Sequence, residues 1–592
     1  MCNIIIKNTR SKIIKNDFSI TILRKRLFAI LIAITFLFLF VIGRLFYVQV
    51  IWGEELQEKA IDQWTREIPI ISRRGKIVDC NGVVLADNTD TYTVFVRKKA
   101  VTELDKLCEV ASEVLQLDYN SVLDRLTKTI SSEVTLKKQV SKDKVDKLLS
   151  YNFSGVYYSR DNSRVYPYGD FLSSVLGFTS NDGKGQSGLE LYYDKYLCGT
   201  NGEILYETDI VGVEIDGGKA SYIPAINGLN IKLTIDYEIQ EVVEEAMREA
   251  MQIHKAKSCQ MIVVEPSTGA IKALALKPSY DLNDVNRDDL NQLFSLSRNN
   301  IISDIYEPGS TFKIFTTVAN VEEYLKGNPK AYSLNHVFNS SRYRYIDGQK
   351  VKCWSTHENG RHAGLNIQGA LNNSCNPIFV DMATSIGKET LYKYIEAFNF
   401  GSTTGIDFSG EANGMVLPVS SVQNVDLARI GFGQTIAVTG LQLAMATSAV
   451  ANGGIYYTPY LVSEIYDSNG IVVQKNYPNE KNRVVSEEAS RIVSDMLEDV
   501  VENGSGRHAY IEGYKVAGKT GTAQKYENGI IAQGKYVSSF IGYFPSNNPM
   551  YLALVIIDEP QGQYYGSTVA APYAKNVFEN IIKLKKIQPI VG

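Results

Sequence analysis

An uncharged apolar run near the N-terminus limits the architecture more than any other feature of the sequence. Residues 27–43 contain no charged side chain and consist mostly of Leu, Ile, Phe and Val. A segment of this length can cross a bilayer as a helix. No small-residue cleavage site follows it, so we expect an uncleaved anchor over residues 27–45 rather than a signal peptide. A buried helix of a globular core is the alternative.

Charge is distributed unevenly about this segment. Residues 1–26 carry seven Lys or Arg side chains and one acidic residue, although the net charge of the whole chain is −4. Basic residues next to a membrane span favour the cytoplasmic side. We therefore expect a cytoplasmic tail over residues 1–26, a single membrane crossing and an extracytoplasmic body. A basic leader on an acidic body does not indicate a nucleic-acid partner.

A serine and a lysine three residues apart are the first candidates for catalysis. Ser310 and Lys313 follow two turn residues at a predicted helix start, so their side chains share one face of the helix. An amine beside a hydroxyl can take its proton and make it a nucleophile for acyl groups. The pattern is short, and a helix-capping serine with a solvated lysine is the alternative interpretation.

Two further motifs in the same chain favour the catalytic interpretation. An S-x-N motif occupies Ser374–Asn376, and a K-T-G motif occupies Lys519–Gly521. The ordered triplet of S-x-x-K, S-x-N and K-T-G is that of serine transpeptidases and β-lactamases. On these residues the sequence resembles the class B penicillin-binding proteins, which are monofunctional peptidoglycan transpeptidases. The resemblance covers about residues 25–585.

The resemblance implies a role for each motif residue. Ser310 is expected to attack the acyl carbonyl, and Lys313 to accept its proton. That transfer requires a lowered Lys313 pKa, which burial and a second cation, Lys519, would provide. Ser374 is expected to pass the proton to the leaving amine, and Asn376 to orient Lys313 and the substrate amide.

The K-T-G segment is expected to work as a strand. Alternation then places Thr520 and Thr522 on one face and Lys519 on the other, directed toward the S-x-N motif. The threonines would bind a substrate carboxylate, and Gly521 would let a peptide or β-lactam backbone come close. By resemblance, the oxyanion hole would be the backbone N–H groups of Ser310 and Thr522.

Possible metal ligands lie between the first two motifs. Cys353, His357 and His362 fall within ten residues, in a chain with only five histidines. These residues can supply three ligands of a closed tetrahedral zinc site, with Asp347 or Cys375 as the fourth. Some class B penicillin-binding proteins carry zinc beside the active site. Such a zinc would be structural, because serine chemistry requires no cofactor. The alternative is a buried Cys–Trp pair with two surface histidines.

The region between the anchor and the catalytic motifs contains a second group of motifs. Residues 74–86 predict a strand, an Asn-Gly turn and a second strand. The same stretch is similar to the box that opens the non-catalytic module of class B penicillin-binding proteins, and a G-L-E box follows at Gly188–Glu190. The resemblance implies a pedestal domain of the dimerisation type over residues 46–225 and a transpeptidase domain over residues 226–592.

The fold class predicted from these patterns is α+β. It comprises a penicillin-recognising serine transpeptidase domain, with an antiparallel sheet flanked by helices, on an extended β-rich pedestal with one N-terminal transmembrane helix. The implied function is a membrane-anchored peptidoglycan D,D-transpeptidase of the division or sporulation group, acylated by β-lactams. A D,D-carboxypeptidase or β-lactam-hydrolysing enzyme would share the triplet, and a non-catalytic β-lactam sensor or scaffold would keep Ser310. The expected partners are stem peptides, β-lactams, the membrane, a polytopic glycosyltransferase and division or sporulation membrane proteins.

Overall fold

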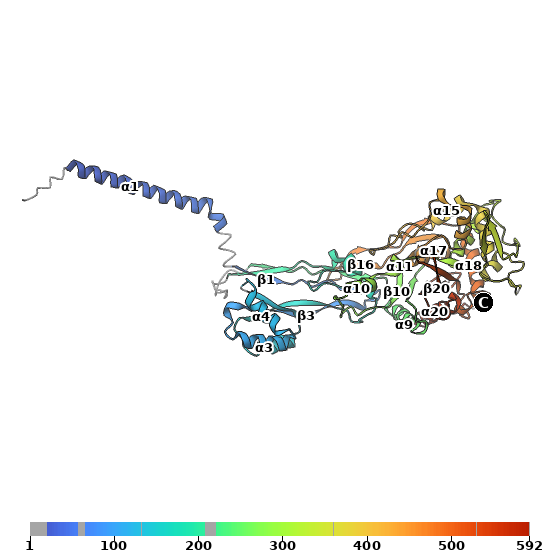
Figure 1. Cartoon of the computed structure of the whole chain (residues 1–592), viewed down its shortest axis with the longest axis horizontal. Coiled ribbons are helices and arrows are strands. Elements are labelled where there is room, and N and C mark those ends of the chain that lie inside the picture. Colours follow the sequence, from blue (N-terminus) through green and yellow to red (C-terminus); the bar gives the residue numbers. More distant parts are fainter. Residues whose placement is uncertain are drawn as a thin grey trace, which may run out of the picture. The chain divides into compact units, whose positions relative to one another are not determined.

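The chain divides into two compact units, which we describe separately (Figure 1). One unit comprises residues 1–70 and 202–224, and the other comprises residues 71–201 and 225–592. Most of the predicted cytoplasmic tail, residues 1–19, lies outside the described residues. The computed structural model describes residues 20–56, 65–131, 133–207, 221–358, 360–527 and 530–590.

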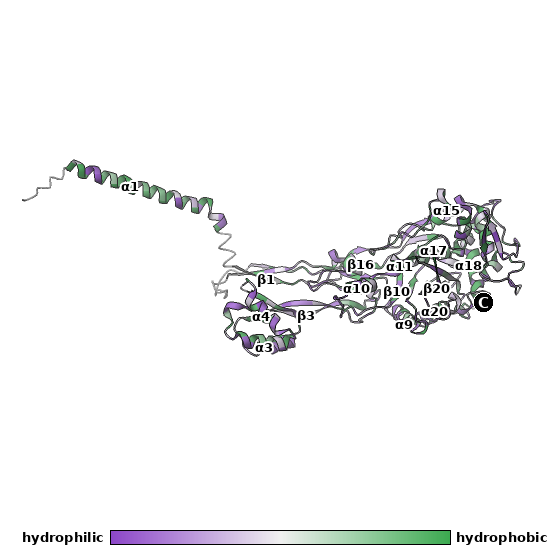
Figure 2. Ribbon diagram, viewed as in Figure 1, coloured by the Kyte–Doolittle hydropathy of each residue, from purple (hydrophilic) through white to green (hydrophobic). Residues whose placement is uncertain are grey.

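The first unit holds an apolar helix and a small sheet. Helix α1 (Ile20–Phe46) continues as one π-helical turn, Tyr47–Ile51. The segment Ile20–Ile51 is long and apolar enough to cross a membrane, and Figure 2 shows it mostly green. The predicted anchor lies within α1. The sheet is antiparallel, in the order β1 (Thr65–Ile70), β6 (Gly202–Glu207) and β7 (Ser221–Ile223).

A seven-stranded sheet forms the pedestal part of the second unit. The predicted turn at Asn81-Gly82 is confirmed, because β2 pairs antiparallel with β3 and Gly82 has a φ of +93°. Strand β8 lies parallel to β2, with Ile231 opposite Ile77. Strands on both sides of the predicted boundary at residue 225 therefore share one sheet. The strands are β17 (Val472–Lys475), β16 (Val462–Tyr466), β8 (Asn230–Leu233), β2 (Ile77–Val78), β3 (Val84–Arg97), β4 (Glu133–Val140) and β5 (Val156–Val165).

A small helical lobe covers one end of β3 and β4. Its helices are α3 (Leu104–Leu115), α4 (Tyr119–Lys128) and α5 (Lys142–Leu149). Each helix presents apolar side chains to Val94 and Val96 of β3 in one buried cluster. This lobe has its own hydrophobic core, and the catalytic motifs lie outside it.

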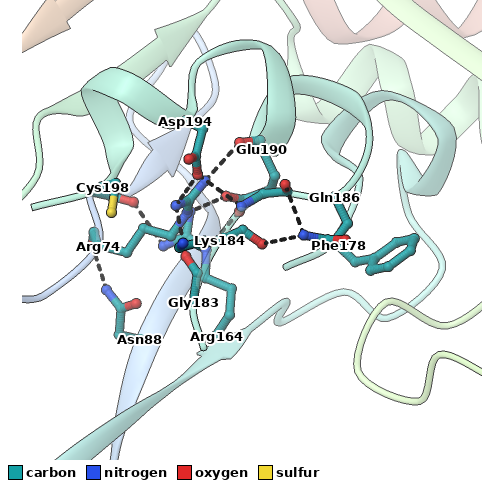
Figure 3. Close-up of polar contacts among 12 residues, drawn as sticks. Arg74, Asn88, Arg164, Phe178, Gly183, Lys184, Gln186, Glu190, Asp194 and Cys198 are labelled. Atoms are coloured by element: carbon teal, nitrogen blue, oxygen red, sulfur yellow. Dashed lines mark hydrogen bonds and ion pairs between the residues drawn. The ribbon is translucent and has the colours of Figure 1, made fainter. Parts of the chain in front are cut away.

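A buried ion cluster ties the pedestal motifs together (Figure 3). Arg74 Nε lies 2.5 Å from Glu190 Oε2, and Arg164 Nε lies 2.7 Å from Glu190 Oε1. Arg74 Nη1 also lies 2.7 Å from Asp194 Oδ1. The Glu190 side chain is fully buried, so its charge is compensated by the two guanidinium groups rather than by water. The cluster joins the first pedestal box to the G-L-E box.

The catalytic part of the second unit is built on a five-stranded antiparallel sheet, which confirms the predicted α+β class. Helices α9 (Tyr237–His254) and α20 (Ala571–Lys585) share a core with one face of this sheet. Helices α12 (Lys313–Leu325) and α17 (Gly440–Ala451) share a core with the other face. The strand order is β10 (Ile271–Lys277), β9 (Ser258–Val264), β21 (Tyr551–Asp558), β20 (Ile530–Phe544) and β19 (Ala517–Glu527).

Replacement of Glu190 by Ala tests the role of the pedestal ion cluster. The change leaves two buried guanidinium groups without their shared carboxylate, which is expected to lower the free energy of unfolding by about 3–5 kcal/mol. Denaturant unfolding of the purified chain measures this loss. Glu113→Ala is the control, because Glu113 forms an exposed pair with Lys147 at 3.3 Å and its removal is expected to change little. Equal effects of the two changes would contradict a structural role for the cluster.

Candidate active site

Ser310 lies on a short turn that leads directly into a buried helix. Residues Gly309–Phe312 form a 3₁₀ turn, and α12 begins at Lys313. Phe312 and Phe315 are buried, and both pack against the ring of Phe400. Ser310 therefore lies just before the N-terminus of α12, and the packing of the neighbouring aromatic side chains holds this helix in place.

Lys313 joins the first two motifs through three hydrogen bonds. Its side chain is fully buried. Its Nζ donates to Ser374 O at 2.8 Å, to Ser374 Oγ at 3.0 Å and to Asn376 Oδ1 at 2.6 Å. Burial lowers the pKa of Lys313 to about 8. An amine with this pKa can accept a proton near neutral pH, as the sequence interpretation requires.

Lys519 is the second buried cation of the site. Burial, followed by the nearby charge of Lys313, lowers its pKa well below the usual value. Among the described residues, its Nζ donates to Ser505 Oγ at 3.4 Å and to Thr520 O at 3.5 Å. It also lies close enough to Lys313, which binds the S-x-N motif, for the two charges to interact. Ser505 lies in a turn whose flanking Gly504 and Gly506 pack tightly against neighbouring residues. The sequence signal for Ser505 was only its place in the loop before β19.

Strand β19 lies directly against the turn that carries the serine. A Cβ at Gly521 would lie 3.1 Å from Pro308 O and 2.4 Å from Ser539 Oγ, so the glycine is required by packing as well as by substrate approach. A Cβ at Gly309 would lie 3.5 Å from Thr522 O. The backbones that carry the two predicted oxyanion donors are thus neighbours. Thr520 is buried, and Thr522 Oγ1 accepts a hydrogen bond from Gly566 N at 3.0 Å.

Four possible metal ligands converge beside the S-x-N motif. Cys353, His357, His362 and Cys375 place one ligand atom each within 4.8 Å of one another. Asp347 lies outside this cluster, and its Oδ2 accepts a hydrogen bond from Asn424 Nδ2 at 3.0 Å. The structure therefore brings in Cys375 as the fourth residue instead of Asp347. The physical reason is that Asp347 occupies the turn between β12 (Tyr343–Ile346) and β13 (Gln349–Lys352).

The four side chains fit a zinc ion by their chemistry. Two thiols and two imidazoles form a common donor set for tetrahedral zinc. His357 Nδ1 lies 2.9 Å from Ser340 O, which leaves Nε2 for the cluster. His362 Nδ1 is buried without a hydrogen-bond partner in the described part of the chain. A hydrogen bond from the Cys375 thiol lowers the pKa of Cys353.

Trp354 was not anticipated as a neighbour of the catalytic motifs. Its indole Nε1 donates to Ser374 O at 3.1 Å, the same carbonyl that Lys313 binds. The side chain is 59% exposed, so the alternative of a buried Cys–Trp pair is wrong for the tryptophan. His362 is buried, which excludes two surface histidines as well. The only sequence signal for Trp354 was its position directly after Cys353.

Comparisons with known proteins agree with this geometry. Residues 260–579 match the penicillin-binding protein transpeptidase domain, and residues 69–233 match the penicillin-binding protein dimerisation domain. The chain therefore belongs to the penicillin-binding protein transpeptidase family. It is 37% identical to Stage V sporulation protein D of Bacillus subtilis, over 96% of this chain and 86% of that protein. It is 28% identical to peptidoglycan D,D-transpeptidase FtsI of Escherichia coli, over 95% of this chain and 91% of that protein.

Solved structures show the same fold. Penicillin-binding protein 2X of Streptococcus thermophilus has a TM-score of 0.72 at 23% identity, covering 88% of this chain and 81% of that chain. Penicillin-binding protein 3 of Mycobacterium tuberculosis, complexed with aztreonam, has a TM-score of 0.68 at 23% identity. That match covers 89% of this chain and 98% of the other. At this level of identity the likeness is one of fold.

Proposed function

We propose that this chain is a membrane-anchored peptidoglycan D,D-transpeptidase that forms an acyl-enzyme on Ser310 and is acylated by β-lactams. One observation carries the proposal: the buried Lys313 amine binds both Ser374 and Asn376 within 3.0 Å, three residues after the nucleophile. Relatives named D,D-transpeptidases support the substrate, and the structure of a relative complexed with aztreonam supports the antibiotic class.

Acylation begins with attack of Ser310 Oγ on the carbonyl between two D-amino acids of a stem peptide. Neutral Lys313 takes the hydroxyl proton, and the oxyanion accepts hydrogen bonds from Ser310 N and Thr522 N. Ser374 Oγ, 3.0 Å from Lys313 Nζ, passes the proton to the leaving amine as the peptide bond breaks. The terminal D-amino acid leaves, and Ser310 holds the remaining peptide as an ester.

The second half of the reaction transfers this peptide to an acceptor. The amine of a second stem peptide attacks the ester, its proton returns through Ser374 and Lys313, and Ser310 recovers its hydroxyl. Before acylation, Thr520 and Thr522 bind the terminal carboxylate of the donor peptide, with the Lys519 amine nearby, and this carboxylate leaves with the terminal D-amino acid. Water in place of the amine would make the enzyme a carboxypeptidase. The match to the dimerisation domain over residues 69–233 favours the transpeptidase.

The anchor places the catalytic body outside the cell. The basic residues that precede the uncharged apolar run hold residues 1–26 in the cytoplasm, so the chain crosses the membrane once with the active site on the extracytoplasmic side. The relative named Stage V sporulation protein D supports a role in spore wall synthesis, and the FtsI relatives support a division role as the alternative. The partners of this chain are a polytopic glycosyltransferase and sporulation or division membrane proteins, which it contacts in the same membrane.

The Cys353, His357, His362 and Cys375 cluster binds one structural zinc ion in this proposal. The support is the convergence of four ligand atoms within 4.8 Å and the unpartnered, buried His362 Nδ1. Zinc would cross-link the segment that carries Trp354 to the S-x-N motif, and catalysis would still be performed by Ser310 and Lys313. A structural zinc adds its binding energy to folding.

Replacement of Ser310 by Ala tests the acyl-enzyme. The change is expected to abolish covalent labelling by a fluorescent penicillin, because the hydroxyl is the atom that forms the ester. Melting temperature and circular dichroism should stay those of the unchanged protein. Peptide mapping of the labelled wild type should place the adduct on Ser310. Labelling at another serine would contradict the assignment.

Metal analysis tests the zinc site. The purified protein is expected to hold about one equivalent of zinc after dialysis, and Cys353→Ser or His357→Ala to lose it and melt at a lower temperature. Chelator treatment of the wild type should produce the same shift. Cys259→Ser is the matched control, because Cys259 is buried in a separate core and should leave the zinc content unchanged. A metal-free protein that is indifferent to chelator would contradict the site.

A further inference from the structure

Two short segments from distant parts of the chain are clamped together beside the nucleophile. The segment Glu307–Gly309 immediately precedes Ser310, and Gly433–Thr435 follows helix α16 (Asn424–Ile430). Gly309 N donates to Gly433 O at 2.9 Å. Thr435 N donates to Glu307 Oε1, also at 2.9 Å. One hydrogen bond therefore joins the two segments at each end, and we call this pair of segments the clamp.

The clamp is tight enough to dictate backbone geometry. A Cβ at Gly433 would lie 2.0 Å from Gly309 O, so the two backbones are in direct contact. Thr435 has a φ of +63°, a left-handed conformation that a β-branched residue rarely adopts. Thr316 Oγ1 of α12 donates to Gly431 O at 2.8 Å, which holds the start of the same turn. The turn 431–435 is thus fixed at one end by α12 and at the other by the Glu307 carboxyl.

The Glu307 side chain binds the backbone of Thr435. Its Oε1 binds Thr435 N, while its Oε2 is buried and has no hydrogen-bond partner in the described part of the chain. Burial raises the pKa of Glu307, against the opposing effects of the Thr435 N–H and the Arg429 charge. Because only one carboxyl oxygen is hydrogen-bonded within the described residues, the amide oxygen of a glutamine at position 307 could accept the same hydrogen bond from Thr435 N.

We propose that Glu307 is a positioning residue for acyl transfer, which holds the turn 431–435 against Gly309 and thereby orients the peptide group between Gly309 and Ser310. That peptide group carries the Ser310 N–H, one of the two oxyanion donors in the proposed function on which this inference rests. Loss of the Thr435 contact frees the turn, and the Gly309–Ser310 peptide then loses its fixed orientation. The predicted consequence is slower formation of the acyl-enzyme with unchanged binding of the β-lactam.

Kinetics of acylation in the full-length, detergent-solubilised protein test the proposal. Rapid-mixing experiments with a fluorescent penicillin give the acylation rate constant at saturation separately from the half-saturating concentration. Because loss of a whole oxyanion donor typically costs about 10²–10³ in rate, Glu307→Ala, which disorders one donor, is expected to slow acylation by about tenfold or more. Its half-saturating concentration should stay that of the wild type. Glu307→Gln keeps an acceptor oxygen for Thr435 N and should acylate within about twofold of the wild type.

A second carboxyl of similar chemistry provides the control. Glu411 Oε1 accepts a hydrogen bond from Thr404 N at 2.6 Å, and its Oε2 accepts one from Gly405 N at 3.2 Å. Glu411→Ala also releases a backbone loop, so it should lower the melting temperature while the folded protein acylates at the wild-type rate. Active-site titration corrects every rate for the folded fraction.

Two results would overturn the positioning role. One is an unchanged saturating rate constant in Glu307→Ala, and the other is a Glu307→Gln protein as slow as Glu307→Ala. Both leave the proposed function intact, provided that the wild type forms its adduct on Ser310 in the same assay. A wild type that does not acylate would instead contradict the proposed function itself.

Discussion

The burial of the Lys313 amine is the interaction on which the catalytic site depends. A buried ammonium requires acceptors, and Ser374 O, Ser374 Oγ and Asn376 Oδ1 supply one each. To place its carbonyl there, Ser374 adopts a φ of +52°, which is unusual for a residue other than glycine. The same carbonyl also accepts the Trp354 indole N–H. The expected base, the expected proton relay and the Trp354 side chain are thereby gathered around one amine, whose pKa burial lowers to about 8.

The scaffold around Lys313 is closely packed at α12, at β19 and at the turn 431–435. Helix α12 has an aromatic core, β19 is packed so closely that Gly521 has no room for a Cβ, and the turn 431–435 holds Gly309. Catalysis by positioned donors requires such rigidity, because an error of about 1 Å can cost about 10² in rate. The pedestal adds a sheet whose strands come from residues 77–165, 230–233 and 462–475. Its ion cluster of Arg74, Arg164 and Glu190 fixes that sheet's motifs together.

The sequence predicted the catalytic residue types more fully than it predicted their contacts in the fold. The three motifs, the Asn81-Gly82 turn and the helix start beside Ser310 depend on local spacing, and all were predicted. The shared pedestal sheet was not, because nothing in β16 indicates that it pairs with β8, more than 200 residues earlier. The fourth residue of the metal cluster was left open for a similar reason: Asp347 and Cys375 are both suitable ligands, and only the direction of the hairpin tip separates them. The contacts that Glu307, Ser505 and Trp354 make with the site are not recorded in any of the three motifs.

The pH dependence of acylation tests the central claim most directly. A base must be deprotonated, so the second-order rate constant for penicillin acylation of Ser310 should rise by about tenfold per pH unit below the Lys313 pKa and level off above it. With that pKa lowered by burial to about 8, the inflection is expected near pH 8. A rate constant that still rises about tenfold per pH unit between pH 8.5 and pH 10, as an unburied lysine of pKa about 10.4 would produce, or one that does not change with pH, would contradict a buried lysine base.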